Sequence, residues 1–215
     1  MAKIKMLVGG CSFSSPFSVP VNCSWPNIVA NRLGYELIDE AAMAGSNYRI
    51  WRTLVNHIRS GNVKNTDKVI VQYTEPHRTE YYTPTTRTPL MYNDQHQFHE
   101  RYKDGYIGKM KWGMEQNLKG HEQTYAKLKI FLSCDEWERE MFEINHTMFE
   151  GYLRSEGFEH VYFLATLYLS TLESHYPIID CTNVLKTHSL KGDPWHLSEG
   201  GHLKVADKVS KVINI

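Results

Sequence analysis

Residues 3–14 have the sequence Lys-Ile-Lys-Met-Leu-Val-Gly-Gly-Cys-Ser-Phe-Ser, in which a short apolar run leads into a glycine-rich turn. A nearly continuous apolar run that ends at glycine is typical of a strand buried on both faces, as in a parallel sheet. Glycine has no Cβ and lets the chain turn sharply where such a strand ends. We therefore expect Ser12 to lie in a loop at the carboxyl end of the first strand.

The rest of the chain alternates between short apolar runs and segments with helical periodicity. Further strands are expected at residues 35–39, 68–73, 161–165 and 177–180, and helices at residues 24–33, 50–58, 135–153 and 198–212. Strands that alternate with helices predict a three-layer α/β/α domain with a mainly parallel sheet of about five strands. Because right-handed crossovers bring the loops after the strands to one edge, the turns at residues 9–12, 44–47 and 73–78 should lie together.

A segment from Glu75 to about residue 125 interrupts this alternation, and it is rich in Tyr, Thr, His, Lys and Gly. Connections inside a domain usually have about 4–6 residues, so the segment is expected to be an insertion with short elements of its own. The sequence thus predicts one domain over residues 1–215 with an aromatic-rich insertion at about 75–125. Its aromatic and imidazole side chains either form a lid that binds sugar rings or acyl groups, or pack the insertion or a subunit contact. They are Tyr81, Tyr82, Tyr92, His96, His99, Tyr102, Tyr106 and Trp112.

Composition excludes several classes of protein. The chain has 24 basic and 24 acidic residues, so it lacks both the basic surface of a general nucleic-acid binder and the charge of an acidic disordered chain. No run approaches the ~20 apolar residues of a membrane span, and no segment has the pattern of a signal peptide. Four widely spaced cysteines form no zinc motif, and the histidines show no metal-ligand spacing. We expect a cytoplasmic protein with reduced thiols, no metal, no cofactor, and neither nucleic-acid nor membrane partners.

Three clusters of side chains carry possible chemistry. The turn at residues 9–14 exposes a serine hydroxyl, or is a plain Ser/Gly turn. Residues 45–47 precede a helix, where backbone N–H groups stabilise a developing oxyanion, or where Ser46 simply caps the helix. Asp193 and His196 are expected in a loop before the last helix, either as a general base with its orienting carboxylate or as a surface pair.

Taken in this order, the clusters resemble the SGNH hydrolases, also called GDSL-like esterases and lipases. The turn Gly10-Cys11-Ser12 corresponds to the G-D-S block that carries the nucleophile, with cysteine in place of aspartate. Gly45 corresponds to the glycine that donates to the oxyanion. The stretch Asp193-Pro194-Trp195-His196 matches the family's D-x-x-H block before the last helix. The family usually has G-x-N-D after the third strand, whereas this chain has Tyr73-Thr74-Glu75, with Thr74 nearest to the asparagine position.

The resemblance implies a flavodoxin-like SGNH fold and a Ser-His-Asp mechanism without cofactor. Ser12 would attack an ester carbonyl, His196 would take its proton, and Asp193 would fix the imidazole tautomer. The backbone N–H groups of Ser12 and Gly45 and the hydroxyl of Thr74 would bind the oxyanion.

Other residues near these blocks are candidate substrate contacts, namely Asn47, Glu75, Arg78 and Trp195. Glu75 and Arg78 could equally form a structural ion pair. We expect Cys11 to have a packing role, and His202 to lie on a helix face rather than act as a second base.

The sequence therefore predicts a serine esterase that removes a short acyl or acetyl group from a carbohydrate or another small molecule. Two alternatives stay open. Cysteine at position 11 and the absent third-block asparagine would suit a glycan-binding or structural protein that has lost efficient catalysis. Transfer of the acyl group to another acceptor would use the same acyl-enzyme.

Overall fold

The computed structural model describes residues 3–43, 45–76, 79–82, 89–92, 107–108, 135–166 and 172–214. Its central sheet has five strands in the order β2-β1-β3-β7-β8, and all neighbours pair in parallel. The strands are β1 (Lys5–Gly9), β2 (Glu36–Asp39), β3 (Lys68–Gln72), β7 (Val161–Ala165) and β8 (Ile178–Asp180). The predicted parallel sheet of five strands is confirmed. Because the chain goes from β1 to β2 on one side and then to β3 on the other, the strand order reverses at β1, where open α/β sheets form ligand crevices.

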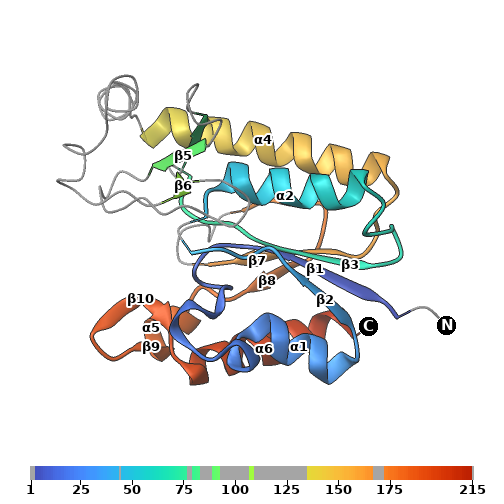
Figure 1. The fold of residues 1–215 in the computed structure, drawn as a ribbon. Coiled ribbons are helices and arrows are strands. Elements are labelled where there is room, and N and C mark those ends of the chain that lie inside the picture. Colours follow the sequence, from blue (N-terminus) through green and yellow to red (C-terminus); the bar gives the residue numbers. More distant parts are fainter. Residues whose placement is uncertain are drawn as a thin grey trace.

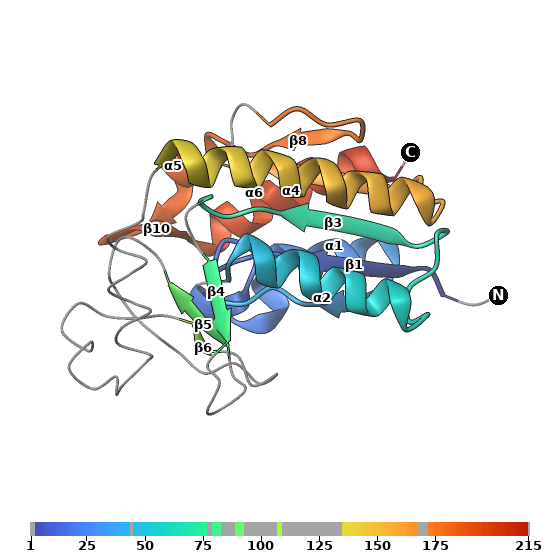
Figure 2. The ribbon, with the colours of Figure 1, turned by 90° about the horizontal axis from the view of Figure 1, so that it is seen from above.

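Helices cover both faces of this sheet, as Figures 1 and 2 show. Helices α1 (Trp25–Leu33) and α6 (Glu199–Ile213) lie on one face, and α2 (Asn47–Arg59) and α4 (Asp135–Ser155) lie on the other. The side chains of β1 alternate between the two layers: Met6 and Val8 belong to the core beneath α1 and α6, and Leu7 to the core beneath α2 and α4. The predicted three-layer α/β/α architecture is thus confirmed.

Two of the helix ends lie at the capping residues that the sequence predicts. Helix α1 ends at Gly34, whose φ of 72° is the left-handed conformation that glycine adopts without strain. The Oγ of Ser46 accepts a hydrogen bond from Arg49 N and caps α2. Ser24 precedes α1 as expected, but its hydroxyl donates to Val21 O instead of capping the helix.

Several short elements were not expected from the sequence. They are η1 (Pro16–Ser18), η2 (Val21–Cys23), α5 (Val184–His188), and the antiparallel strands β9 (Ser189–Leu190) and β10 (Asp193–Leu197). Three further strands, β4 (Thr79–Tyr82), β5 (Pro89–Tyr92) and β6 (Ile107–Gly108), form a small separate sheet in the region expected to be an insertion.

The aromatic lid stays a prediction. Tyr81 and Tyr82 lie on β4 and Tyr92 on β5. The other side chains proposed for the lid, from His96 to Trp112, lie outside the described residues.

Candidate active site

Ser12 lies in a tight turn directly after β1. The carbonyl oxygen of Cys11 accepts hydrogen bonds from Ser14 N and Ser15 N, both at 3.0 Å. In a trans peptide the N–H points opposite to the carbonyl, so the N–H of Ser12 is directed away from the turn. Within the described part of the chain, neither this N–H nor the Ser12 hydroxyl makes a hydrogen bond. The turn therefore leaves a hydroxyl and a backbone donor without hydrogen bonds on the same residue, which is 8% exposed.

Asp193 and His196 form a short hydrogen-bonded pair. His196 Nδ1 lies 2.6 Å from Asp193 Oδ2, and both residues belong to β10. In a regular strand, residues three apart point to opposite faces. Here the pairing with β9 shifts register between Asp193 and Leu197, and such an irregularity can re-aim side chains. With Nδ1 bonded to the carboxylate, Nε2 is the nitrogen left to accept a proton.

The segment after Ser12 packs against the strand that carries His196. The Oγ of Ser18 donates to Leu197 O at 2.8 Å, and the rings of Phe17 and His196 lie 5.0 Å apart. Among the described residues, His196 has no hydrogen-bond partner other than Asp193. Ser12 and His196 are therefore not hydrogen-bonded to each other in this structure, and their pairing in the reaction stays a prediction.

Gly45 lies against the Ser12 turn, as the sequence predicted for the second block. A Cβ at this position would lie 3.1 Å from Gly10 O and 3.6 Å from Cys11 Cα. The N–H of Gly45, however, donates to Ala42 O at 3.0 Å. This N–H would have to leave Ala42 before it could bind an oxyanion.

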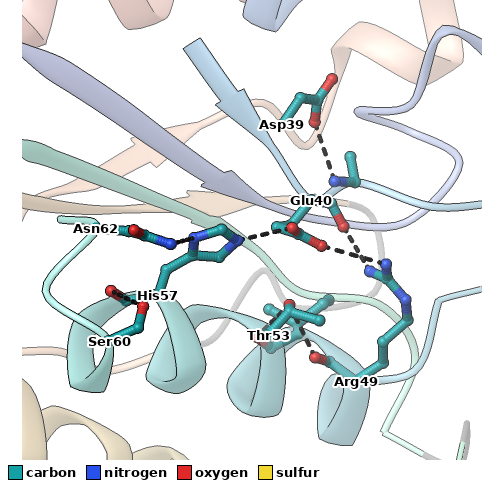
Figure 3. Close-up of polar contacts among 9 residues, drawn as sticks. Asp39, Glu40, Arg49, Thr53, His57, Ser60 and Asn62 are labelled. Atoms are coloured by element: carbon teal, nitrogen blue, oxygen red, sulfur yellow. Dashed lines mark hydrogen bonds and ion pairs between the residues drawn. The ribbon is translucent and has the colours of Figure 1, made fainter. Parts of the chain in front are cut away.

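The loop that leads from β2 to Gly45 is held by charged side chains from α2 (Figure 3). The carboxylate of Glu40 pairs with Arg49 Nη2 at 3.4 Å and with His57 Nε2 at 2.7 Å. Arg49 Nη1 also donates to the Glu40 carbonyl at 2.5 Å, and Ala42 N donates to Gly10 O at 3.0 Å. Sequence reasoning missed these anchors, because Glu40, Arg49 and His57 match no motif.

Asn47 is not a substrate contact, which corrects the sequence-based prediction. It is 1% exposed, and its Nδ2 donates to Thr74 O at 3.1 Å and to Glu75 O at 3.3 Å. Its Oδ1 accepts from Thr74 N at 2.9 Å. The amide of Asn47 thus ties the start of α2 to the chain that leaves β3, and both of its donors are used.

The other residues at this end of β3 are also buried. Glu75 is 3% exposed, so its side chain is covered in this structure, and its contact with substrate stays a prediction. Thr74 is fully buried, and its Oγ1 has no hydrogen-bond partner among the described residues. An unpaired buried hydroxyl is uncommon in proteins, which makes Thr74 an unusual group at the carboxyl end of the sheet. Arg78 lies outside the described residues, and Trp195 lies on β10 beside His196.

Two other predictions concern side chains that were expected to pack. Cys11 is buried in the core beneath α1 and α6, which confirms its packing role. His202 is buried on α6, where its Nδ1 accepts a hydrogen bond from Trp25 N at 3.3 Å. Burial lowers the pKa of His202 to about 4. It therefore packs α6 against α1 and is not a second base.

Two features are absent from the described residues. Nowhere in the described ranges do three or more His, Cys, Asp or Glu side chains gather as metal ligands would. The helices found in these ranges are also too short or too polar to cross a bilayer.

Comparison with known proteins places the fold. No protein-family model matches the sequence, and no curated protein matches it. Solved structures do match. The psychrotrophic esterase EstA from Pseudoalteromonas sp. has a TM-score of 0.55 at 7% identity, covering 98% of this chain and 96% of that chain. A member of the lipolytic G-D-S-L family from Veillonella parvula has a TM-score of 0.51 at 10% identity, covering 98% of both chains.

A lipase from a goat rumen metagenome matches with a TM-score of 0.52 at 15% identity, covering 97% of this chain and 96% of that chain. The likeness extends over nearly the whole chain, and at such low identity it concerns the fold. The chain therefore has the fold of the G-D-S-L lipolytic proteins, the SGNH hydrolase fold that its sequence motifs predicted.

Proposed function

We propose that this protein is an SGNH-type serine esterase that hydrolyses a short acyl ester such as an acetyl ester. The observation that carries the proposal is the 2.6 Å bond between His196 Nδ1 and Asp193, on a strand that packs against the segment after Ser12. The fold supports it, since solved proteins of this fold include an esterase and a lipase.

The reaction would proceed through an acyl-enzyme. Ser12 Oγ attacks the ester carbonyl while His196 Nε2 accepts its proton, and the Asp193 carboxylate stabilises the imidazolium. The developing oxyanion accepts a hydrogen bond from Ser12 N–H, joined by Gly45 N–H once it leaves Ala42 and by Thr74 Oγ1–H once the buried chain after β3 uncovers it. His196 then protonates the leaving alcohol, and a water molecule releases the acyl group from Ser12 by the same steps.

The nature of the alcohol is a separate part of the proposal. The aromatic side chains of the insertion suit an ester whose alcohol is a carbohydrate, because aromatic faces bind sugar rings.

A second candidate function is glycan binding with little turnover. One observation favours it: the N–H of Gly45 is already bonded to Ala42 O, so one oxyanion donor is occupied. Removing one such donor can slow an acyl transfer by ~10²–10³. Transfer to an added alcohol in place of water would be detected by product analysis.

The test is the Ser12→Ala variant. It should lose hydrolysis of p-nitrophenyl acetate and labelling by a fluorophosphonate probe, because both need the Ser12 oxygen as nucleophile. Ser60→Ala is the matched control, since Ser60 lies on an exposed part of the chain after α2 and should leave both unchanged. Equal labelling of wild type and Ser12→Ala would contradict the proposal. A wild type that binds acetylated glycans but is never labelled would favour the second candidate.

A further inference from the structure

A buried polar network lies beneath the Ser12 turn, and the reaction described above does not use it. Gln72, the last residue of β3, is 1% exposed. Its Oε1 accepts a hydrogen bond from Cys11 N at 3.0 Å and another from Ser14 Oγ at 3.1 Å. Its Nε2 donates to Tyr73 O. One amide from the neighbouring strand thus holds two points of the turn that carries Ser12.

A second side chain completes the network. Trp25 Nε1 donates to Ser14 Oγ at 3.1 Å, so the Ser14 hydroxyl accepts from Trp25 and donates to Gln72. Ser14 and Trp25 are both fully buried. Because buried polar groups are costly when unpaired, such a network has one strongly preferred geometry.

The network also explains why residue 10 is glycine. A Cβ on Gly10 would lie 2.7 Å from Ser14 Oγ and 3.0 Å from Gln72 Oε1. Since β1 and β3 pair in parallel with Gly9 beside Val71, Gln72 follows the strand to the level of Gly10. Only a residue without a side chain lets the amide of Gln72 reach Cys11 and Ser14 together.

The consequence falls on Ser12. Cys11 is fixed at both ends, because its N–H donates to Gln72 and its carbonyl accepts from Ser14 N and Ser15 N. The plane of the peptide between Cys11 and Ser12 is therefore set, and with it the direction of the Ser12 N–H.

We propose that Gln72 is a positioning residue that aims the N–H and hydroxyl of Ser12 at the substrate. This inference rests on the proposed esterase function. Gln72 lies beneath the turn and acts through Cys11 and Ser14, so it stabilises the transition state without contacting the substrate. In the SGNH hydrolases that the sequence resembles, an asparagine after the third strand donates to the oxyanion directly. In this chain the amide of Gln72, at the end of the third strand, instead fixes the peptide that carries the Ser12 N–H.

The test compares two substitutions of Gln72. Gln72→Leu removes both acceptor bonds while keeping similar volume, and kcat for p-nitrophenyl acetate should fall about 10–100-fold, as is typical when a supporting partner of a site is removed. KM should stay within about twofold, because Gln72 does not bind substrate. Gln72→Glu keeps an oxygen that accepts from Cys11 and Ser14. In its protonated form it also donates to Tyr73 O. Its kcat relative to the wild type at the same pH should therefore be largely restored while this carboxyl is protonated, and should fall as the carboxyl ionises.

Two measurements keep a folding defect apart from a positioning defect. All rates are expressed per active site, counted by fluorophosphonate titration. If Gln72→Leu does not fold, Ser14→Ala removes one arm of the same network and should also lower kcat with KM unchanged. Two outcomes would overturn the role of Gln72 and leave the proposed esterase function standing. One is wild-type kcat per active site in Gln72→Leu, and the other is a Gln72→Glu variant with no higher kcat than Gln72→Leu at any pH. A wild type that neither reacts with the probe nor hydrolyses the ester would overturn the proposed function, and the role of Gln72 with it.

Discussion

At the scale of single residues, the tautomer of His196 depends on what Asp193 presents to Nδ1. A carboxylate only accepts, so it favours the tautomer with the proton on Nδ1 and leaves Nε2 free to take the proton of Ser12. Asp193→Asn can present an N–H instead, which would place the proton on Nε2. We expect kcat to fall by ~10²–10⁴, at the lower end if solvent competes, because the Asp193 side chain is 37% exposed.

The measurement is steady-state hydrolysis of p-nitrophenyl acetate by Asp193→Asn. Asp207→Asn is the control, since Asp207 pairs with Arg32 on the exposed surface at 2.8 Å and should leave kcat unchanged. An Asp193→Asn variant that keeps more than a tenth of wild-type kcat would show that Asp193 does not orient His196 in the reaction.

Single residues also show which roles a local sequence pattern can predict and which it cannot. The motif around Asp193 and His196 predicted their pairing, but it did not contain the register shift of β10 that turns the two side chains toward each other. Asn47 was assigned to substrate, yet its amide is consumed by the chain leaving β3. Gln72 was overlooked, because a single polar residue at the end of an apolar strand gives no sign of its partners. Both outcomes depend on contacts with residues at least 27 positions away, which a local pattern does not contain.

At the scale of elements, the segment before α6 was expected to be a loop and is a short hairpin. Gly192 has a φ of 82° in the turn between β9 and β10, which suits glycine. The proline and tryptophan that follow Asp193 obscure any alternation, so the strand could not be recognised from its sequence. The hairpin brings α5 close to the start of α6, where Ser198 N and Ser198 Oγ both donate to His188 O.

This close approach gives the two glycines of α6 opposite roles. A Cβ on Gly201 would lie 2.7 Å from His188 O and 2.9 Å from Leu197 Cδ2, whereas a Cβ on Gly200 would find its nearest neighbour at 3.7 Å. Gly201→Ala should therefore lower the free energy of unfolding by about 1–3 kcal/mol through overpacking. Gly200→Ala should raise it by about 0.5–1 kcal/mol, because alanine favours the helix more than glycine does.

Urea denaturation of the two variants, read by far-UV circular dichroism, measures both effects. Each variant is the control for the other, since the two substitutions are chemically identical and adjacent. Shifts of the same sign would mean that the contact between Gly201 and His188 does not constrain the start of α6.

At the scale of the whole molecule, the alternation of strands and helices predicted the three layers and the parallel sheet. The alternation does not by itself determine the strand order β2-β1-β3-β7-β8, which depends on the face that each crossover helix covers. That order brings the ends of β1, β2 and β3 together and places Gly45 against the Ser12 turn. The resemblance predicted this contact, because in the SGNH hydrolases the blocks of Ser12 and Gly45 belong to one site.

The stability of the whole molecule should depend on pH through Asp39 and His202, whose pKa shifts have opposite effects on it. Burial raises the pKa of Asp39 to about 6, so its ionised form is disfavoured in the folded protein. Its contribution to stability is present at low pH and is lost as the pH rises to about 6. Burial lowers the pKa of His202 to about 4, so its contribution is present at neutral pH and is lost as the pH falls from about 6.5 to about 4.

Each shift corresponds to about 3 kcal/mol, at about 1.4 kcal/mol for each pH unit. In the wild type the two contributions should nearly cancel between pH 7 and pH 4. Asp39→Asn removes one of them, so acidification from pH 7 to pH 4 should destabilise this variant by up to about 3 kcal/mol more than the wild type. His202→Gln removes the other, and its stability should change in the opposite direction relative to the wild type. Urea unfolding at both pH values measures the change for each protein and cancels any constant cost of the substitution. Equal changes in all three proteins would show that neither group couples folding to pH in this range.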